Sequence, residues 1–307
     1  MDRISRPRVP ASGSPLNEGG RRRIRTTLLF VAPAFLAYAA FVLVPLGLSL
    51  FYSTLRWDGI GRWRFTGLNN YVTVLTDPDL LKVIFNAFEL VAYFTLIPVG
   101  LALAVASVIR PYMAGAFGTV TRTVLFLPQV IPLVAAGIAW SWMFANSGLV
   151  NQGLRTIGLG FLARGWLGDF TFALPAVGII GAWVLLGLCT MLMVTGIAKI
   201  DQSLYEAARL DGANAWHEFI YITVPGLRQE IGVAVTVTVI AALASFDIVY
   251  IATAGGPGLE TTVPGLEIYR LAFAHRQVGL ASALAIVLML LVLICVLPIQ
   301  WLTRVRR

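Results

Sequence analysis

The sequence predicts an all-α polytopic membrane protein with six transmembrane helices. Of its 307 residues, 58% are hydrophobic and only 12% are charged, whereas a soluble globular protein has about 45–50% apolar and about 25% charged residues. Six runs carry one charge or none and approach or exceed the roughly 20 apolar residues that a spanning helix needs. The polar stretches between these runs are short, so no large soluble domain is expected.

The six expected spans cover most of the chain. They are, in order, residues 26–55, 83–109, 123–144, 171–198, 231–254 and 277–303. Pro33 and Pro45 in the first run are expected to kink it, which a helix bundle tolerates. This first run is far longer than the hydrophobic region of a signal peptide, so we interpret it as a retained span.

The basic residues predict the orientation of the spans. Residues 1–25 are rich in Arg, Pro, Gly and Ser, a composition typical of a disordered tail. The tail, the loops at 110–122 and 199–228, and the C-terminus together hold fifteen of the 23 Lys and Arg residues; the opposite side holds eight. The positive-inside rule therefore places both termini and the 199–228 loop in the cytoplasm.

The 199–228 loop is an unusually polar segment of this apolar chain. Ser203 and Glu206 have the spacing of a capping box, which predicts a helix that begins at Ser203. Gly212 is suited to the left-handed conformation that ends such a helix. The loop is therefore expected to contain a short helix followed by a sharp turn.

A second short helix is expected after this turn. Asn214 is a suitable cap for it, and Pro225 is expected to end it. Its apolar face is expected to be formed by Trp216, Phe219, Ile220 and Thr223. Two short helices joined at a glycine, between membrane spans, would make a compact projection from the bundle.

The spacing of residues in this loop resembles a known family. Glu206-Ala207-Ala208, then Gly212 and Ile222, then Pro225, resembles the cytoplasmic EAA loop of ABC importer permeases. Val224 stands where leucine is common in that loop. The alternative is a purely structural role, in which Glu206 only caps a helix and Gly212 only ends one. The flanking membrane spans and the spacing of the whole motif favour the resemblance.

The resemblance extends over most of the chain. Residues 65–71 followed by Asp77-Pro78 resemble the first external loop of sugar-importer permeases, and the Gly-Gly-Pro turn at 255–257 with residues 268–273 and 279–283 supports this. From about Leu28 to Val305, the order of spans and loops resembles the carbohydrate-type (MalF-like or glycerol-phosphate-permease-like) subgroup. It implies a type I ABC importer permease (MetI-like) fold, with residues 26–307 as the permease domain, a core at 82–303 and a coupling loop at 199–228.

The resemblance also implies partners. These are a second homologous permease subunit, two ATP-binding subunits and an extracytoplasmic solute-binding protein, in the cytoplasmic membrane of a prokaryote. No P-loop sequence occurs in the chain, so ATP and Mg²⁺ are expected on the partner ATPase subunits and no cofactor or metal on this chain. The basic residues lie beside the spans, which favours membrane lipid and not nucleic acid as their partner.

The residues expected to couple the loop to the ATPase follow from the matched positions. They are Glu206, Ala207, Ala208, Arg209, Asp211, Gly212, Ile222 and Pro225. Glu206 is the first candidate for a charged contact with the ATPase. The two alanines would allow close approach, Gly212 would allow the turn, and Asp211 would brace it.

Polar residues within the spans are candidates for the substrate path, because such residues are costly in a membrane and usually face the bundle interior. The candidates are Asn86, Glu89, Gln129, Thr238, Ser245 and Asp247. For Glu89 the alternatives are an ion pair with Lys82 or a position at the membrane interface. For Gln129 the alternative is to bond backbone groups freed by Pro128 and Pro132.

A di- or oligosaccharide is the first expectation for the substrate, and glycerol-3-phosphate or a glycerophosphodiester is the second. A secondary transporter is disfavoured because no inverted repeat is evident. An intramembrane enzyme is disfavoured because the chain holds no His-Glu-x-x-His or Gly-x-Ser-x-Gly pattern. No catalytic residue is therefore expected.

Overall fold

The structure is a computed structural model, and it describes residues 29–112 and 115–303. The basic tail at 1–25 and the C-terminal arginines lie outside the described residues. The chain divides into two units, Met1–Ser49 and Leu50–Arg307, which are considered separately below.

A helix runs over Leu29–Ser53, with a π-helical segment η1 at Ala39–Leu43 followed by α2 (Val44–Ser53). The later elements are β1 (Leu55–Arg56), β2 (Arg64–Phe65), α3 (Asn69–Thr76), α4 (Pro78–Ile109), η2 (Arg110–Tyr112), α5 (Ala116–Val130), α6 (Leu133–Met143), α7 (Leu149–Thr156), η3 (Gly160–Leu162), η4 (Trp166–Gly168), α8 (Ala173–Ile197), α9 (Gln202–Leu210), α10 (Ala215–Glu218), η5 (Phe219–Thr223), α11 (Val224–Gly226), α12 (Arg228–Leu243), α13 (Asp247–Ala252), α14 (Pro264–Tyr269), η6 (Arg270–Ala274) and α15 (Val278–Thr303).

The described residues contain four helices long and apolar enough to cross a membrane, or up to six if each of two bent helix pairs is one span. The helical membrane fold class is thus confirmed, while the number of spans lies between four and six. The straight helices at Leu29–Ser53, α4, α8 and α15 match the first, second, fourth and sixth expected spans.

The third expected span is not one straight helix. α5 and α6 meet at an angle of 99°. Ile131 between them is extended, with φ −73° and ψ 127°, because the residue before a proline is excluded from the helical region by the ring of Pro132. The bend therefore follows from Pro132, and the hydrophobicity used to predict the span gives no information about it.

The second bent pair is Ala215–Gly226 and Arg228–Leu243, which meet at 71°. The fifth expected span, 231–254, is not one helix either. α12 ends at Leu243, and Phe246 leaves the helical region with φ −141° and ψ −59°. A new helix, α13, begins at Asp247. Residues 231–254 are therefore two helices, and α12 itself begins earlier than expected, at Arg228.

Pro45 and Pro225 each stand in a helix, one residue beyond a π-helical segment. Pro225 follows η5, where the Val224 N–H donates to the Phe219 carbonyl; Pro45 follows η1, where the Val44 N–H donates to the Ala39 carbonyl. A proline lacks an N–H and crowds the carbonyl four residues earlier, and the wider π-turn accommodates both effects. The helix ends at Gly226, one residue after Pro225, and the chain bends by 71° before α12; the expected end at Pro225 is confirmed to within one residue.

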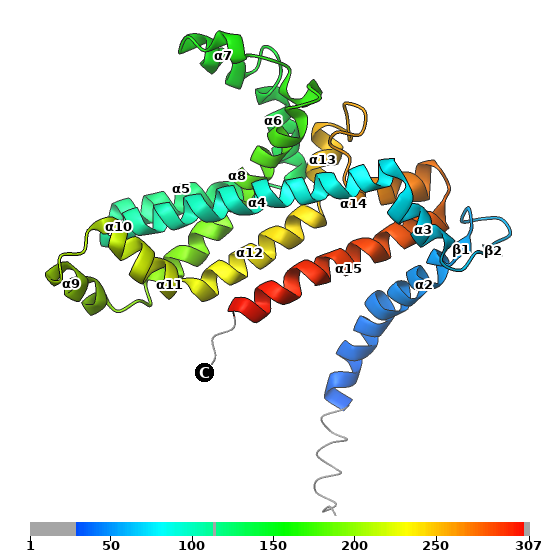
Figure 1. The fold of residues 1–307 in the computed structure, drawn as a ribbon, viewed down its shortest axis with the longest axis horizontal. Coiled ribbons are helices and arrows are strands. Elements are labelled where there is room, and N and C mark those ends of the chain that lie inside the picture. The colour runs from blue at the N-terminus through cyan, green and yellow to red at the C-terminus, as the bar shows by residue number, and fades with distance from the viewer. Residues whose placement is uncertain (1–28, 113–114, 304–307) are drawn as a thin grey trace, which may run out of the picture. The chain divides into compact units, whose positions relative to one another are not determined.

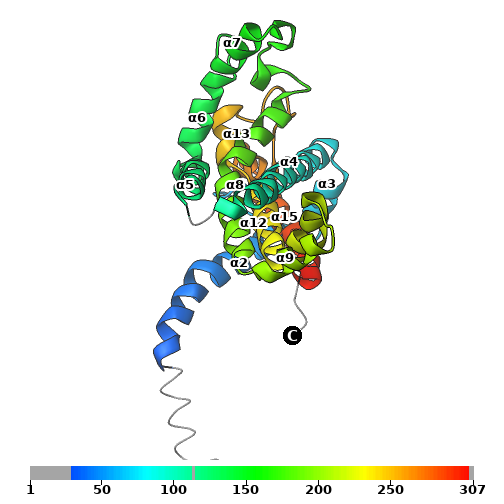
Figure 2. The same cartoon turned by 90° about the vertical axis from the view of Figure 1, so that its left-hand side faces the viewer.

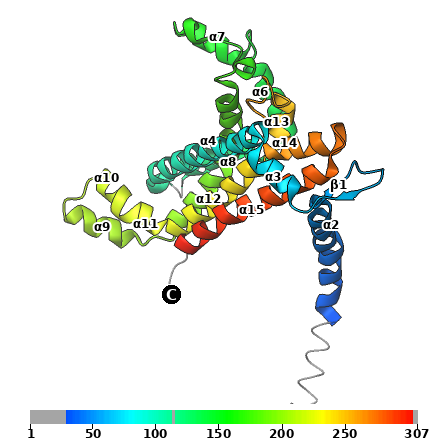
Figure 3. The same ribbon diagram turned by 45° about the vertical axis from the view of Figure 1, so that its right-hand side comes forward.

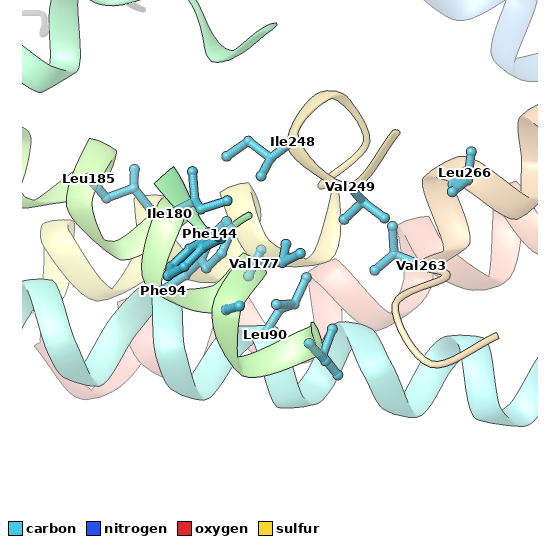
Figure 4. Close-up of a cluster of buried hydrophobic side chains, with 13 residues drawn as sticks. Leu90, Phe94, Phe144, Val177, Ile180, Leu185, Ile248, Val249, Val263 and Leu266 are labelled. Carbon is cyan, nitrogen blue, oxygen red and sulfur yellow. The ribbon is translucent and has the colours of Figure 1, made fainter. Parts of the chain in front are cut away.

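Within the Leu50–Arg307 unit, α4, α8 and α12 pack side by side, and α15 lies along α12 (Figures 1 and 2). Their main hydrophobic core includes Leu90 and Phe94 from α4 and Val177 and Ile180 from α8 (Figure 4). Any side chain at Gly181 of α8 would collide with the Phe94 ring. The small residue therefore lets the two helices approach.

The two ends of this unit carry different elements. Helices α9, α10 and α11 form one end, and the β1–β2 hairpin with α3 lies at the opposite end (Figures 1 and 3). The hairpin is antiparallel, with Leu55 opposite Phe65 and Arg56 opposite Arg64. The loop between α8 and α12 thus lies at the end of the unit opposite to the hairpin.

Candidate functional site

The coupling loop begins with a helix whose cap differs from the expected one. The Asp201 carboxylate accepts the Ser203 N–H at 2.9 Å, so Asp201 is the N-cap and α9 starts at Gln202. The expected capping box of Ser203 and Glu206 is therefore wrong. A carboxylate is a stronger acceptor than a hydroxyl at a helix N-terminus, where the dipole also favours a negative charge. The hydrogen bond from Ser203 lowers the pKa of Asp201.

The turn after α9 is the expected one. Gly212 has φ +84°, the left-handed conformation that glycine adopts without cost. The Ala213 N–H donates to the Ala208 carbonyl at 2.9 Å, and the Gly212 N–H donates to that of Arg209 at 3.1 Å. These bonds satisfy carbonyls that the end of a helix leaves free.

The cap of the second helix is confirmed, since Asn214 Oδ1 accepts the His217 N–H at 2.9 Å. The expected apolar face is confirmed only in part. Thr223 is buried and Phe219 half-buried, but Trp216 is 64% exposed and Ile220 38% exposed, and the buried Glu218 lies outside the expected face. The π-turn that begins at Phe219 shifts the register of the helix, so a face drawn with 3.6 residues per turn does not stay on one side.

Glu218 is the centre of an ion-pair network that sequence reasoning missed. It is 7% exposed. Arg209 Nε donates to its Oε1 at 2.6 Å, and Arg110 Nη2 donates to its Oε2 at 3.0 Å. The hydrogen bond from Arg209 is the main cause that lowers the pKa of Glu218 below its ordinary value. The carboxylate therefore stays charged between two guanidinium groups.

Arg110 directly follows α4, and it connects the coupling loop to that helix. Its guanidinium carbon lies 3.5 Å from the centroid of the buried Tyr205 ring of α9. The Tyr205 hydroxyl is 3.0 Å from Thr223 Oγ1. The short helices of the loop are thus bound to each other and to the end of α4 by one polar cluster, which we call the loop anchor: Arg110, Tyr205, Arg209, Glu218 and Thr223.

A further ion pair fixes the base of the loop. Lys199 Nζ lies 3.0 Å from Glu230 Oε1, so the residues just after α8 are held to the first turn of α12. Gly196 of α8 faces Glu230 and Leu227 closely enough that an added Cβ would lie 2.6 Å from each. The loop therefore leaves and re-enters the bundle through a tightly packed base.

The coupling residues proposed from the sequence divide into two groups. Arg209 is engaged inside the chain by Glu218. Glu206, by contrast, is exposed and makes no hydrogen bond or ion pair with any residue that the structure describes. Ala207, Asp211 and Gly212 are exposed beside it.

Apolar side chains lie on the same outer surface of the loop. Leu210 is 90% exposed, and Tyr221 is 72% exposed. Ile222 is half-buried, while Pro225 is exposed. A carboxylate without a partner beside exposed apolar side chains is a surface suited to another protein.

Two of the expected substrate-path residues are already engaged within the bundle. The buried Asn86 amide donates to the carbonyls of Leu259 and Thr262 at 2.8 and 2.9 Å. The buried Thr238 hydroxyl donates to that of Thr95 at 3.0 Å. These bonds hold the 255–263 loop and α12 to α4.

The two acidic candidates are exposed at the surface of the unit. The alternative pairing of Glu89 with Lys82 is wrong, because Lys82 Nζ lies 2.8 Å from Glu260. Asp247 stands in the first turn of α13, where the helix dipole favours its charge. Ser245 is buried in the bend before that helix.

Gln129 is the candidate with unused hydrogen-bonding capacity. Its Oε1 is buried without a partner in the structure, as is Oγ1 of the fully buried Thr190 on α8. Gln129 lies against Gly187, whose absent side chain lets α5 approach α8. Buried polar atoms without a partner are unusual in native structures and call for an explanation.

Sequence reasoning missed Arg110, Tyr205, Glu218 and Thr190. Arg110 and Glu218 are 108 residues apart, and a single sequence carries no signal for such a pair. The burial of Glu218 and Tyr205 also depends on the register of η5. Among the described residues, no group of three or more His, Cys, Asp or Glu side chains is arranged to hold a metal ion.

Comparison with known proteins agrees with this arrangement. Residues 97–305 match the family described as "Binding-protein-dependent transport system inner membrane component". The chain is 35% identical over 267 residues to a probable ABC transporter permease protein of Bacillus subtilis (YurN), covering 86% of this chain and 91% of that protein. It is 32% identical over 295 residues to a diacetylchitobiose uptake system permease protein of Streptomyces coelicolor (NgcF), covering 89% and 83%.

The fold is also that of a solved transporter chain. A chain of a bacterial ABC transporter involved in the import of alginate superposes with a TM-score of 0.75 at 23% identity, covering 94% of this chain and 99% of that one. Permeases of this family are non-catalytic, and ATP is bound by a separate ATPase. The chain therefore belongs to the family of binding-protein-dependent transport system inner membrane components, as a multi-pass permease subunit of an ABC importer.

Proposed function

We propose that this permease moves a di- or oligosaccharide across the cytoplasmic membrane, with a solute-binding protein, a second homologous permease and two ATPase subunits as partners. Relatives carry names that point to sugars: diacetylchitobiose, starch degradation products and lactose. A solved alginate transporter of the same fold is in complex with its periplasmic binding protein. Residues 26–307 would form the permease domain, with both termini and the 199–228 loop in the cytoplasm.

The proposal that the 199–228 loop couples the permease to the ATPase rests on a difference between the inner and outer surfaces of the loop. Inside, Glu218 binds Arg110 and Arg209. Outside, Glu206 has no partner within the described part of the chain. A loop that is rigidly attached to a spanning helix and presents an unpaired carboxylate is suited to receive force from a docked ATPase and to pass it to α4.

The proposed path of force is short. The ATPase would bind Glu206, Ala207, Ala208 and the turn at Gly212, with Ile222 and Pro225 on the following helix. When the ATPase subunits close, the loop would move as one body, because the loop anchor prevents α9 from moving independently of α10. Arg110 would then transmit the displacement to α4. Arg209 and Asp211 would support the loop rather than contact the ATPase.

For the substrate path we favour Gln129 over the other five candidates. A sugar hydroxyl is a suitable donor for its unpartnered Oε1, and Thr190 Oγ1 offers a second such atom on the neighbouring α8. Glycerol-3-phosphate or a glycerophosphodiester is the weaker alternative, since no Lys or Arg occurs at 83–109 or 231–254 to meet a phosphate. The second permease subunit would supply the remaining contacts.

The test is purification of the full chain with its co-expressed partners, followed by uptake of a radiolabelled disaccharide into proteoliposomes that contain ATP. The wild-type chain should retain the ATPase and the second permease. Glu206→Lys should release the ATPase or separate ATP hydrolysis from uptake. Asp79→Lys, the same charge change at an exposed position of the opposite end, is the matched control and should leave both intact.

Two outcomes would contradict the proposal. One is a chain that purifies alone and transports along an ion gradient regardless of Glu206→Lys. The other is normal ATPase binding together with normally coupled uptake in both lysine variants, which would remove Glu206 from the interface. Gln129→Ala should reduce uptake while ATPase binding is retained, which separates the substrate path from the coupling surface.

A further inference from the structure

An arginine-lined cavity lies at the end of the Leu50–Arg307 unit opposite to the coupling loop. Its volume is about 730 Å³, and its lining includes four arginines and a single acidic residue. The arginines are Arg56, Arg62, Arg64 and Arg276. The sequence predicts eight basic residues on the external side of the membrane, and these four arginines are half of them. The positive-inside rule favours basic residues on the cytoplasmic side, so such a cluster on the external side is unusual.

The charge in this cavity is compensated only in part within the described residues, by the electrostatic attraction between Asp58 and Arg276. None of the four guanidinium groups takes part in an ion pair. The single carboxylate, Asp58, accepts the N–H groups of Ile60 and Gly61 at 3.0 and 2.7 Å. These two bonds are the main causes that lower the pKa of Asp58, and Asp58 is thus engaged in shaping the hairpin turn.

Two of the arginines are held directly opposite each other. Arg56 and Arg64 are paired residues of the β1–β2 ladder, and like charges at such positions repel and destabilise a hairpin. The hairpin is nevertheless fixed to the bundle, because the Asn70 amide donates to the carbonyls of Ser53 and Leu55, each at 2.8 Å. The fold therefore places two arginines opposite each other on the hairpin, where a bound anion would reduce the repulsion between their charges.

The cavity lies where a candidate spanning helix begins. Gln277, Gly279 and Leu280, at and just before the first turn of α15, line it. The hairpin and α3 surround it (Figures 1 and 3). This position corresponds to the level of the lipid headgroups, since α15 enters the hydrocarbon from here.

Exposed apolar side chains stand beside the cavity on the hairpin, the loop after it and α3. They are Ile60 (82% exposed), Trp63 (59%), Phe65 (66%), Leu68 (70%), Val72 (56%) and Leu75 (58%). A short segment that combines arginines with exposed aromatic and aliphatic residues is typical of a surface that lies in the membrane interface. The position at the start of a candidate spanning helix favours lipid over an acidic protein as the partner of these residues.

We propose that this cavity binds the phosphate of an anionic phospholipid headgroup, with the neighbouring apolar side chains against the acyl chains. Guanidinium groups bind phosphate oxygens through paired N–H bonds, and the four arginines would surround one such group. This site is independent of the coupling loop and of the transported solute. It would fix the hairpin and the start of α15 to the lipid headgroup layer.

The test uses the full-length chain in detergent and counts bound lipid by native mass spectrometry. Phosphatidylglycerol is titrated against phosphatidylcholine, and inorganic phosphate is added as a competitor in a separate arm. The wild-type chain should prefer phosphatidylglycerol. The double variant Arg56→Gln/Arg64→Gln should bind it roughly thirtyfold more weakly, since each basic residue near a lipid surface contributes about fivefold.

Arg155→Gln is the matched control, because Arg155 is exposed on the same side but lies in α7 outside the cavity; its affinity should stay within about twofold of wild type. If the double variant does not give a monodisperse protein, Arg62→Gln, which is outside the strand pairing, should still lose about fivefold. Unchanged binding by these variants, or equal affinity for phosphatidylcholine, would overturn the proposal.

Two further results would also overturn it by assigning the cavity to another anion. Displacement of phosphatidylglycerol by inorganic phosphate at equal concentration would show a site for a free phosphorylated solute. Loss of binding to the solute-binding protein in the double variant, with lipid binding retained, would show a docking surface for an acidic protein.

Discussion

Two glutamates of the coupling loop have opposite environments. Glu206 is exposed and makes no ion pair with the residues at 29–112 and 115–303, whereas Glu218 is buried between Arg110 and Arg209. Removing one partner of a buried charge pair leaves the other desolvated and unpaired, which costs more than the pair itself contributes. Substitution of Glu218 should therefore lower the stability of the chain, whereas substitution of Glu206 should affect coupling to the ATPase and not stability.

Glu218→Gln should lower the free energy of unfolding of the isolated permease by about 1–3 kcal/mol, the loss of charged hydrogen bonds that are partly open to water. Glu206→Gln should change it by less than about 0.5 kcal/mol, as for an exposed residue without partners. Denaturant titration of the purified chain, followed by Trp fluorescence, measures both. Equal stability of the two variants would mean that the loop anchor does not hold the loop to α4.

At the scale of the elements, glycines on α8 determine how closely the helices pack. The Phe94 ring of α4 fills the space over Gly181, and the Tyr93 side chain does so over Gly178. These glycines follow each other at i and i+3, so they form one smooth strip on α8. Close approach of backbones at small residues is a usual way for helices to associate in membranes.

Gly181→Ala should therefore destabilise the chain by about 1–3 kcal/mol through overpacking. The control is Gly153→Ala in α7, where nothing lies within 4 Å of an added Cβ; there alanine should be neutral or stabilise by up to about 1 kcal/mol through helix propensity. Thermal aggregation of the detergent-solubilised variants gives the comparison. A Gly181→Ala variant as stable as Gly153→Ala would show that α4 and α8 are not in contact at this point.

At the scale of the whole molecule, the distribution of basic residues determines the proposed orientation. The two cysteines, Cys189 and Cys295, are free and lie within helices. They can be replaced to give a background for labelling. Ser147 and Ser203 are exposed. They lie in loops that the sequence predicts on opposite sides of the membrane, and thus report the two sides.

In intact cells, a membrane-impermeant maleimide should label Ser147→Cys fully. It should label Ser203→Cys only after the membrane is permeabilised, because the positive-inside rule places the coupling loop in the cytoplasm. Gel shift of the labelled chain measures the modified fraction. The reverse pattern would place the loop outside and remove its role in binding an ATPase.

The sequence alone determined the membrane class, the positions of the straight spans and the ends of the coupling turn. These features depend on local properties: an apolar run reports a span, Gly212 permits a positive φ, and Asn214 supplies an acceptor for free N–H groups. Such properties are encoded within a few residues. For that reason they can be deduced before any contact is known.

Tertiary structure decided what depends on distant partners or on register. Glu218 is buried between Arg110 and Arg209 while Trp216 is exposed, which the expected face did not include. The pairing of Lys82 with Glu260 replaced the one expected with Glu89, and the arginine cavity formed from a hairpin and a helix start about 200 residues apart in the sequence. A contact between remote segments depends on how the helices pack, and a single sequence does not specify that packing locally.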